Sequence, residues 1–317
     1  MKKAFVKKLI SNQYTLVDLT SGKEFIASAR GKLRHMRIDE DSSFNRQTTK
    51  KTKKENKVVT ISPKVGDVVF YDDQEQVQIT EVLPRQNELE RPDVANIDQV
   101  LVVFSVIRPD FSFHLLDKFL VILDLERLPV VLVISKIDLI DDEPLQALKE
   151  DLSYYVSMGY DIHYVNSKER IGFDVLTTIF KDKITVLAGQ TGVGKSTLLN
   201  ALMPELQLKT QEISHALGRG KHTTRHTELY EFGGGYIADT PGFSKIDFRI
   251  FEPDMLKECY PDFNALSSSC RFGNKCLHQH EPGCAVREAT EQGKIPPWRL
   301  AHYRLFLEEI KNQKPKY

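Results

Sequence analysis

The segment GQTGVGKS, Gly189 to Ser196, combines residue types that suit the binding of phosphates. Glycines at fixed spacing let backbone N–H groups surround a phosphate at the start of a helix, and the lysine adds positive charge. Lys195 is expected to reach the β- and γ-phosphates of a nucleoside triphosphate, and the Ser196 hydroxyl to ligate Mg²⁺. The residues predicted to bind the phosphates are Gly189, Gln190, Thr191, Gly192, Val193, Gly194, Lys195, Ser196 and Thr197.

A second motif, SKID at Ser135 to Asp138, could read the base of the nucleotide. A carboxylate at Asp138 can accept hydrogen bonds from N1–H and N2–H₂ of guanine together, whereas adenine offers no such pair of donors. Lys136 would lie over the ring plane. Ser135 stands where the usual NKxD pattern has Asn, and its shorter hydroxyl could bond either guanine or the phosphate loop less firmly. Asn166 and Ser167 occupy the place from which a backbone N–H usually supports base reading.

A third motif, DTPG at Asp239 to Gly242, supplies groups for hydrolysis. Asp239 can hold Mg²⁺ through a water molecule, and the Gly242 N–H can contact the γ-phosphate. The next residue is Phe243, at the place where Ras-like enzymes carry a glutamine that orients the attacking water. A phenyl ring cannot orient water, so intrinsic turnover is expected to be slow.

The polar, glycine-broken stretch Lys209 to His226 is typical of a switch that becomes ordered around a γ-phosphate. Thr224 is the expected second protein ligand of Mg²⁺, with Thr223 as the alternative. His222 is a candidate for orienting the hydrolytic water; the alternative is a histidine that faces solvent. The predicted catalytic set is therefore His222, Thr224, Asp239 and Gly242.

The order of these motifs is unusual, because the base-reading box precedes the phosphate loop. Small GTPases have the reverse order, so this order indicates a circularly permuted GTPase. Such a rotation is physically permissible, since nucleotides bind to loops at the carboxyl ends of parallel strands wherever the chain begins.

A cysteine-rich segment lies near the end of the chain. Cys270, Cys276, His278 and Cys284 offer three thiolates and one imidazole, which make a closed tetrahedral zinc site of the structural kind. His280 is the rival fourth ligand. A disulfide is disfavoured in a reducing cytosol.

The residues ahead of these motifs differ in composition. Residues 1–71 hold 16 Lys and Arg against 7 Asp and Glu, although the whole chain of 317 residues has a net charge of zero. Short strands are expected at Lys2–Ile10, Tyr14–Asp18, Glu24–Ala29, Val58–Ile61 and Val68–Tyr71, which favours a small barrel of the OB type. The lysine-rich insertion at residues 46–57 is either a solubilising loop or a contact for a polyanion.

Alternating apolar runs and helical patterns begin at about residue 99 and predict repeated βα units around a parallel sheet. The fold class expected is a multidomain α/β protein with three parts. These are an OB-type barrel (1–71), a circularly permuted P-loop GTPase domain (72–247) and a mostly helical zinc-binding domain (248–317). No apolar run is long enough for a membrane span or a signal peptide, so a cytoplasmic protein with no membrane partner is expected.

Taken in this order, the barrel, the permuted GTPase motifs and the cysteine cluster resemble the ribosome small-subunit-dependent GTPase A family (RsgA). The resemblance covers nearly the whole chain and also includes ARGKLRH (Ala29–His35), VGD (Val65–Asp67) and GRGKHTT (Gly218–Thr224). The departures are Ser135, the lysine-rich insertion and the five-residue spacing between Cys270 and Cys276.

The resemblance implies a GTPase that binds the small ribosomal subunit during its late maturation, with rRNA contacts from the barrel and the zinc module. It also implies turnover that the subunit stimulates, with GTP as substrate, Mg²⁺ and one structural Zn²⁺, in a chain that is monomeric when free. Two alternatives remain. One is a structural RNA-binding protein with a weak nucleotide site, and the other is a kinase or ATPase, which Asp138 opposes.

Overall fold

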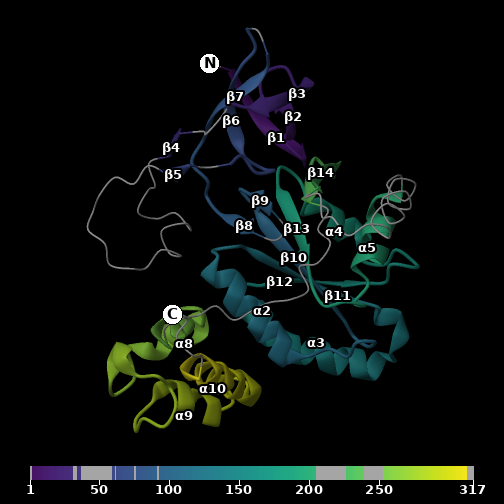
Figure 1. Ribbon diagram of the computed structural model, residues 1–317. Helices are drawn as coiled ribbons and strands as arrows, with labels where there is room; N and C mark the ends of the chain where they lie inside the picture. Colours follow the sequence, from purple (N-terminus) through teal and green to yellow (C-terminus); the bar gives the residue numbers. More distant parts are fainter. Residues whose placement is uncertain are drawn as a thin grey trace.

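The computed structural model describes residues 2–30, 34–36, 59–60, 62–74, 76–90, 93–204, 226–238 and 253–312. Three parts can be followed in Figure 1: a β-barrel that contains the N-terminus, a central α/β domain, and a helical module at the C-terminal end. This arrangement confirms the predicted fold class.

The barrel closes through five strands, because β1 pairs with both β2 and β6, while β7 pairs with β6 and β3. Its interior holds alternate apolar side chains such as Leu16, Val69 and Ile79, which are fully buried. The barrel strands are β1 (Lys2–Ile10), β2 (Gln13–Asp18), β3 (Glu24–Ala29), β6 (Val68–Asp72) and β7 (Gln78–Val82).

One barrel strand differs from the prediction. The expected strand at Val58–Ile61 is represented by β5 (Val59–Thr60), which pairs with β4 (Arg34–Met36) in a separate two-stranded sheet. The fifth barrel strand is β7, so the barrel continues past the boundary expected at residue 71. It forms an antiparallel hairpin with β6, and its pairing with β3 is parallel and long-range.

The central sheet is parallel over β12-β11-β10-β13-β15, and β14 adds one antiparallel strand. Every residue of β10 and β13 is buried, as the continuous apolar runs predict. The strands are β10 (Gln99–Ser105), β11 (Val130–Ser135), β12 (Asp161–Val165), β13 (Ile184–Ala188), β14 (His226–Phe232) and β15 (Gly235–Ala238), and β8 (Glu88–Glu90) and β9 (Asp93–Ala95) form a separate hairpin.

Helices cover both faces of this sheet. Apolar residues of α2 (Phe113–Leu125) and α3 (Asp142–Ser157) join the core on one face. Those of α4 (Phe173–Thr178) and α5 (Lys195–Leu202) join the core on the other. Helix α2 begins where the Ser112 hydroxyl accepts a hydrogen bond from the Leu115 N–H, which caps the helix.

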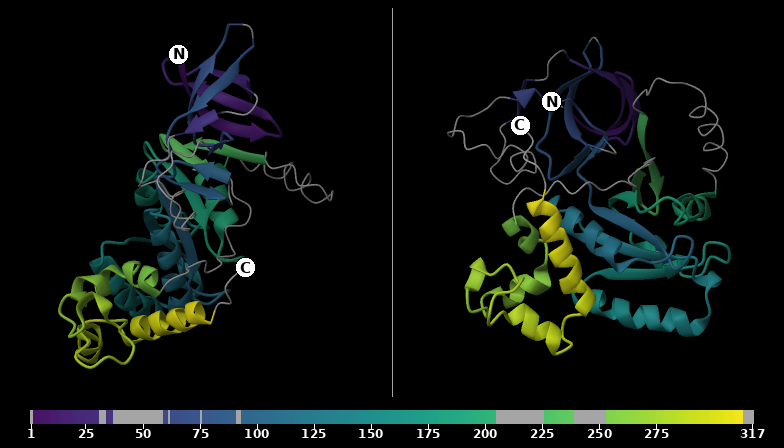
Figure 2. Two further views of the ribbon diagram at one scale, coloured as in Figure 1. Left: turned by 60° about the vertical axis from the view of Figure 1, so that its left-hand side comes forward. Right: turned by 60° about the horizontal axis from the view of Figure 1, so that its bottom comes forward.

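Strand β1 joins the barrel to the central domain, because it also pairs antiparallel with β14. Lys8 lies opposite Glu228 in this ladder, and their side chains form an ion pair of 2.9 Å. The two sheets therefore make one continuous run of eleven strands, and Figure 2 shows the barrel standing at the β14 edge of the central domain.

The C-terminal module consists of short helices around their own core, in which four cysteines lie beside aromatic rings such as Phe263 and Tyr303. Cys259 and Tyr303 are both buried in this core. The elements are α7 (Pro253–Glu258), α8 (Pro261–Ser267), η3 (Gly273–Lys275), α9 (Ala285–Glu291) and α10 (Pro297–Lys311). Among the described residues, no helix is both long and apolar enough to cross a membrane.

Candidate active site and metal centre

The predicted nucleotide site lies where neighbouring parallel strands end. Ser105 and Ser135 are opposite each other at the carboxyl ends of β10 and β11, and β12 and β13 end beside them. The segments that follow these strands carry the predicted base-reading and phosphate-binding residues. Loops at the carboxyl edge of a parallel sheet are the usual place for nucleotides in α/β folds.

The phosphate loop requires its glycines. Gly189 has a φ of 134°, and a Cβ atom there would lie 2.2 Å from the Val103 carbonyl oxygen of β10. Gly194 has a φ of 95° and precedes the first residue of α5, Lys195. Only glycine fits the first position without moving backbone atoms, and glycine favours the second because of its left-handed conformation.

The Lys195 side chain lies over its own loop. Its Nζ donates to the carbonyl oxygens of Gly189 and Gln190, both at 2.7 Å. Burial lowers the pKa of Lys195. Thr191, Ser196 and Thr197 are exposed beside it. Among the described residues, Lys195 Nζ is held by these two carbonyl groups of its own loop, from which it can move to a phosphate.

The base-reading box holds the phosphate loop directly. The Ser135 Oγ is 2.6 Å from the Val193 carbonyl oxygen, and Lys136 Nζ donates to the Gly192 carbonyl oxygen at 2.7 Å. Two consecutive residues, the last of β11 and the one that follows it, thus bind two consecutive carbonyls of the loop after β13. Of the two alternatives left for the Ser135 hydroxyl, the structure has the bond to the phosphate loop.

Asp138 lies on a single 3-10 turn, η1 (Ile137–Leu139), directly after Lys136. Its carboxylate is 3.3 Å from the ammonium of Lys168, whose side chain is 73% exposed. The buried Asn166 arranges this contact, since its Oδ1 accepts the N–H groups of Lys168 and Glu169. Lys168 is not among the residues predicted from the sequence, although it directly follows the predicted pair Asn166 and Ser167.

The residues predicted for Mg²⁺ binding and hydrolysis other than Ser196 lie outside the described residues. They are His222, Thr223, Thr224, Asp239, Gly242 and Phe243. The described strand β15 ends at Ala238, one residue before Asp239, and pairs in parallel with β13, the strand that leads to the phosphate loop. The carboxyl end of β15 therefore lies at the same edge of the sheet as the carboxyl end of β13.

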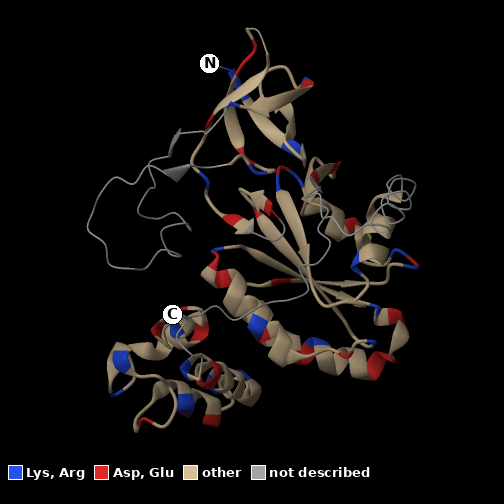
Figure 3. Ribbon diagram, in the orientation of Figure 1, with Lys and Arg blue, Asp and Glu red and all other residues tan. Residues whose placement is uncertain are grey.

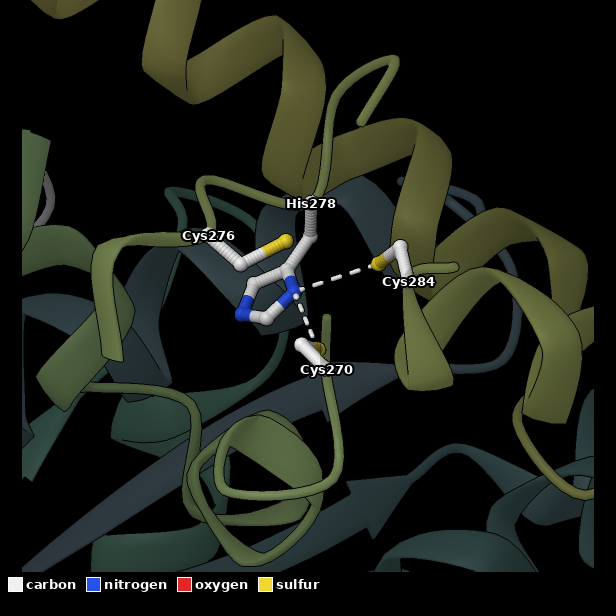
Figure 4. A group of neighbouring side chains, drawn as sticks. All are labelled: Cys270, Cys276, His278 and Cys284. Atoms are coloured by element: carbon white, nitrogen blue, oxygen red, sulfur yellow. Dashed lines mark hydrogen bonds between the residues drawn. The ribbon is translucent and has the colours of Figure 1, made fainter. Parts of the chain in front are cut away.

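The cysteine cluster is brought together inside the C-terminal module. The ligand atoms of Cys270, Cys276, His278 and Cys284 all lie within 4.8 Å of one another, and all four residues are buried. Figure 4 shows the three thiols around one side of the His278 ring. Its Nδ1 is 3.4 Å from the Cys284 Sγ and 3.7 Å from the Cys270 Sγ. The rival ligand, His280, is exposed and lies outside this cluster.

Burial favours the neutral forms of three side chains in this cluster when no metal is bound. Burial raises the pKa of the Cys276 and Cys284 thiols, and burial lowers the pKa of His278 to about 4. A buried neutral imidazole with three thiols is the donor set that structural zinc sites use, and bound metal would replace the thiol protons. The Glu281 carboxylate holds the loop around His278 by accepting the N–H groups of Leu277, Gln279 and His280.

Comparison with protein families matches residues 82–249 to the RsgA GTPase model. A relative from Onion yellows phytoplasma (strain OY-M), named small ribosomal subunit biogenesis GTPase RsgA, is 51% identical over 99% of each chain. A relative of the same name from Geobacillus kaustophilus (strain HTA426) is 47% identical over 81% of this chain and 88% of its own.

Two solved structures resemble the whole fold. The structure of YloQ, described as a circularly permuted GTPase, has a TM-score of 0.78 and 35% identity, and the match covers 100% of this chain and 97% of YloQ. The structure of YjeQ from Thermotoga maritima has a TM-score of 0.78 and 33% identity, with 99% of each chain covered. The likeness to YloQ agrees with the permuted order of motifs in this sequence.

Proposed function

The chain belongs to the RsgA GTPase family, and from this premise we propose that it hydrolyses GTP during biogenesis of the small ribosomal subunit. One observation carries the nucleotide part of the proposal. Ser135 and Lys136 hold the carbonyls of Val193 and Gly192, so the guanine-reading box and the phosphate loop form one hydrogen-bonded unit.

Within this unit, each residue has a proposed role. Asp138 accepts the Watson–Crick donors of guanine, releasing its contact with Lys168. Lys195 leaves the carbonyls of its own loop for the β- and γ-phosphates, and the exposed Ser196 hydroxyl would hold Mg²⁺. Bound Mg²⁺ would neutralise charge on the phosphates. Thr224, Asp239, Gly242 and His222 complete the proposed catalytic set.

The proposed partner is the small ribosomal subunit and its rRNA, contacted through the barrel and the zinc module in the cytoplasm by a chain that is monomeric when free. The names of the relatives support the partner. In the described barrel, Lys7 and Lys8 are paired with Glu231 and Glu228, and Figure 3 shows both signs of charge on the C-terminal module. The basic surplus of the first segment therefore falls mainly on the insertion at residues 46–57.

The test is GTP hydrolysis measured with and without purified small ribosomal subunits. We expect slow turnover by the free chain, because Phe243 cannot orient water, and a large stimulation by the subunits. Equal rates with and without subunits would contradict the proposed partner. If Lys195→Ala left subunit binding and release unchanged, the chain would instead be an RNA-binding protein with a weak nucleotide site.

A base-exchange variant tests the guanine assignment separately. Asp138→Asn should shift the preference from GTP toward xanthosine triphosphate, because the amide donates where the carboxylate accepted. The measurement is competition between GTP, ATP and xanthosine triphosphate for the wild-type chain and the variant. Unchanged GTP affinity in Asp138→Asn would count against the box, and better competition by ATP in the wild type would indicate an ATPase.

A further inference from the structure

We propose that Ser135 is a positioning residue of the phosphate loop and that this chain binds guanine without reading its N7 atom. The inference rests on the proposed GTP site and adds a statement about which edge of the base is recognised. The Watson–Crick edge is read by Asp138, while the Ser135 side chain has no donor left for the N7 edge.

The Ser135 hydroxyl carries a single hydrogen that it can donate. Two backbone carbonyl oxygens already lie within reach of this hydroxyl: that of Val193 at 2.6 Å and that of Phe104 at 3.0 Å. The side chain is buried, with the residue 2% exposed. The single proton is therefore used inside the protein.

Guanine presents two acceptors, N7 and O6, along one edge. Recognition of this edge by a side chain therefore requires a donor. An asparagine at this position would have two N–H groups, one for the loop carbonyl and one left for the base. Serine has none left. Its lone pairs are of no use toward N7, because two acceptors do not form a hydrogen bond.

The Ser135 proton stays on the loop because its loss there is costly. If the hydroxyl turned toward the base, the Val193 carbonyl would lose its bond to Ser135. Leaving a buried acceptor unpaired costs more than an ordinary hydrogen bond contributes. The neighbouring bond from Lys136 to the Gly192 carbonyl holds the same part of the loop, at 2.7 Å. A Cβ atom on Gly194 would lie 3.7 Å from the Ser135 Oγ, so the hydroxyl sits directly against the loop.

The experiment compares the binding of GTP with that of 7-deaza-GTP, in which a C–H group replaces N7. For the wild-type chain we expect dissociation constants that agree within about twofold. Ser135→Asn should bind GTP about 3- to 10-fold more tightly than 7-deaza-GTP, the effect of one gained hydrogen bond. Ser135→Ala should weaken the binding of both nucleotides by the same factor, because it releases the loop and leaves base recognition unchanged.

The matched control is Ser105→Ala, which removes a buried hydroxyl from the residue opposite Ser135. Ser105 donates to the Pro109 carbonyl at 2.7 Å, so its loss should leave the ratio of the two dissociation constants unchanged. Because Ser135→Ala needs no extra space, it keeps the comparison informative if the larger asparagine prevents folding.

Two results would overturn the inference. A wild-type preference for GTP over 7-deaza-GTP of about threefold or more, abolished in Ser135→Ala, would show that the hydroxyl reads the base. That result would leave the proposed GTPase function intact. Failure of the wild-type chain to bind GTP at all would instead overturn the proposed function together with this inference.

Discussion

Lys195 is the residue whose replacement best separates nucleotide chemistry from folding. Its ammonium bonds to the carbonyls of Gly189 and Gln190, and both belong to the loop that the glycines already hold in place. Removing the side chain therefore leaves the core of the sheet and its helices untouched. The lysine is half-buried, and its bonds to the loop carbonyls keep it close to where phosphate oxygens would lie.

We predict that Lys195→Ala lowers the rate of subunit-stimulated GTP hydrolysis by about 10²-fold or more, as expected for the loss of one charged group at developing phosphate charge. Phosphate release measures the rate, and circular dichroism checks that the unfolding temperature changes by no more than about 2 °C. The matched control is the exposed Lys181→Ala, which should retain the wild-type rate. Full activity of Lys195→Ala would remove this loop from the proposed site.

At the scale of single elements, the turn between β2 and β3 depends on one carboxylate. Asp18 accepts hydrogen bonds from the N–H groups of Thr20 and Ser21, and from the hydroxyls of Ser21 and Tyr71. The hydrogen bond from Tyr71, followed by those from Ser21, lowers the pKa of Asp18 to about 2 from its ordinary 3.8. The charged form is therefore favoured in the folded barrel.

This shift has a defined consequence for stability. A lowered pKa in the folded state contributes stability above the ordinary value of 3.8, and the contribution is lost as pH falls toward about 2. We predict that Asp18→Asn is less stable at neutral pH and that its unfolding midpoint falls less steeply between about pH 4 and about pH 2. Urea unfolding at several pH values measures this. The surface variant Asp73→Asn should follow the wild-type profile, and parallel profiles for Asp18→Asn would contradict the assignment.

The segment that carries His278 contains the four proposed zinc ligands. Cys270, Cys276 and Cys284 belong to the core of the C-terminal module, and the buried His278 imidazole lies among their thiols. A bound cation would turn this cluster into the centre of the module, because the free energy of metal binding adds to that of folding.

We predict that Cys276→Ser lowers the bound zinc from about one ion per chain to a small fraction, and that strong chelators lower the unfolding temperature of the module. Metal content is measured by elemental analysis after gel filtration. The matched control is Cys259→Ala, since Cys259 is buried in the same core but lies outside the cluster. Zinc retained by Cys276→Ser and lost by Cys259→Ala would contradict the proposed ligand set.

Over the whole molecule, the features that the sequence predicts well are those whose signals are local in the chain. The sequence predicts the phosphate loop at the start of a helix and repeated βα units around it, and β13 and α5 confirm these elements, because glycine spacing and apolar runs are local signals. Strand β7 was missed although it forms a local antiparallel hairpin with β6, because its buried residues, Ile79 and Val82, do not follow strict alternation and the pairing contains a register shift. Lys168 was missed because only the folded edge of the sheet brings it to Asp138.

The attachment of the C-terminal module to the central domain is a further long-range feature. Arg299 of α10 is fully buried and donates to Asp117 of α2 and to Asp262 of α8. Tyr155 and His302 also contact the Asp117 carboxylate, at 2.8 and 2.6 Å. Although burial favours a neutral group, the two carboxylates keep the pKa of Arg299 well above its ordinary value. Arg299 and Asp117 are 182 residues apart in the sequence, so no sequence pattern predicts this network.

A buried ion pair is most costly when only one partner is removed, because the other charge stays buried. We therefore predict that Arg299→Ala destabilises the contact between α2 and α10 by about 3–5 kcal/mol. Hydrogen exchange of the α10 amides should then lose protection by about 10²- to 10³-fold. Lys118→Ala is the matched control at the same contact, since its ion pair with Glu309 is 3.5 Å long and less buried. Its loss should cost less than about 1 kcal/mol. Equal protection of α10 in the two variants would mean that apolar packing, and not the Arg299 network, holds the zinc module on the GTPase domain.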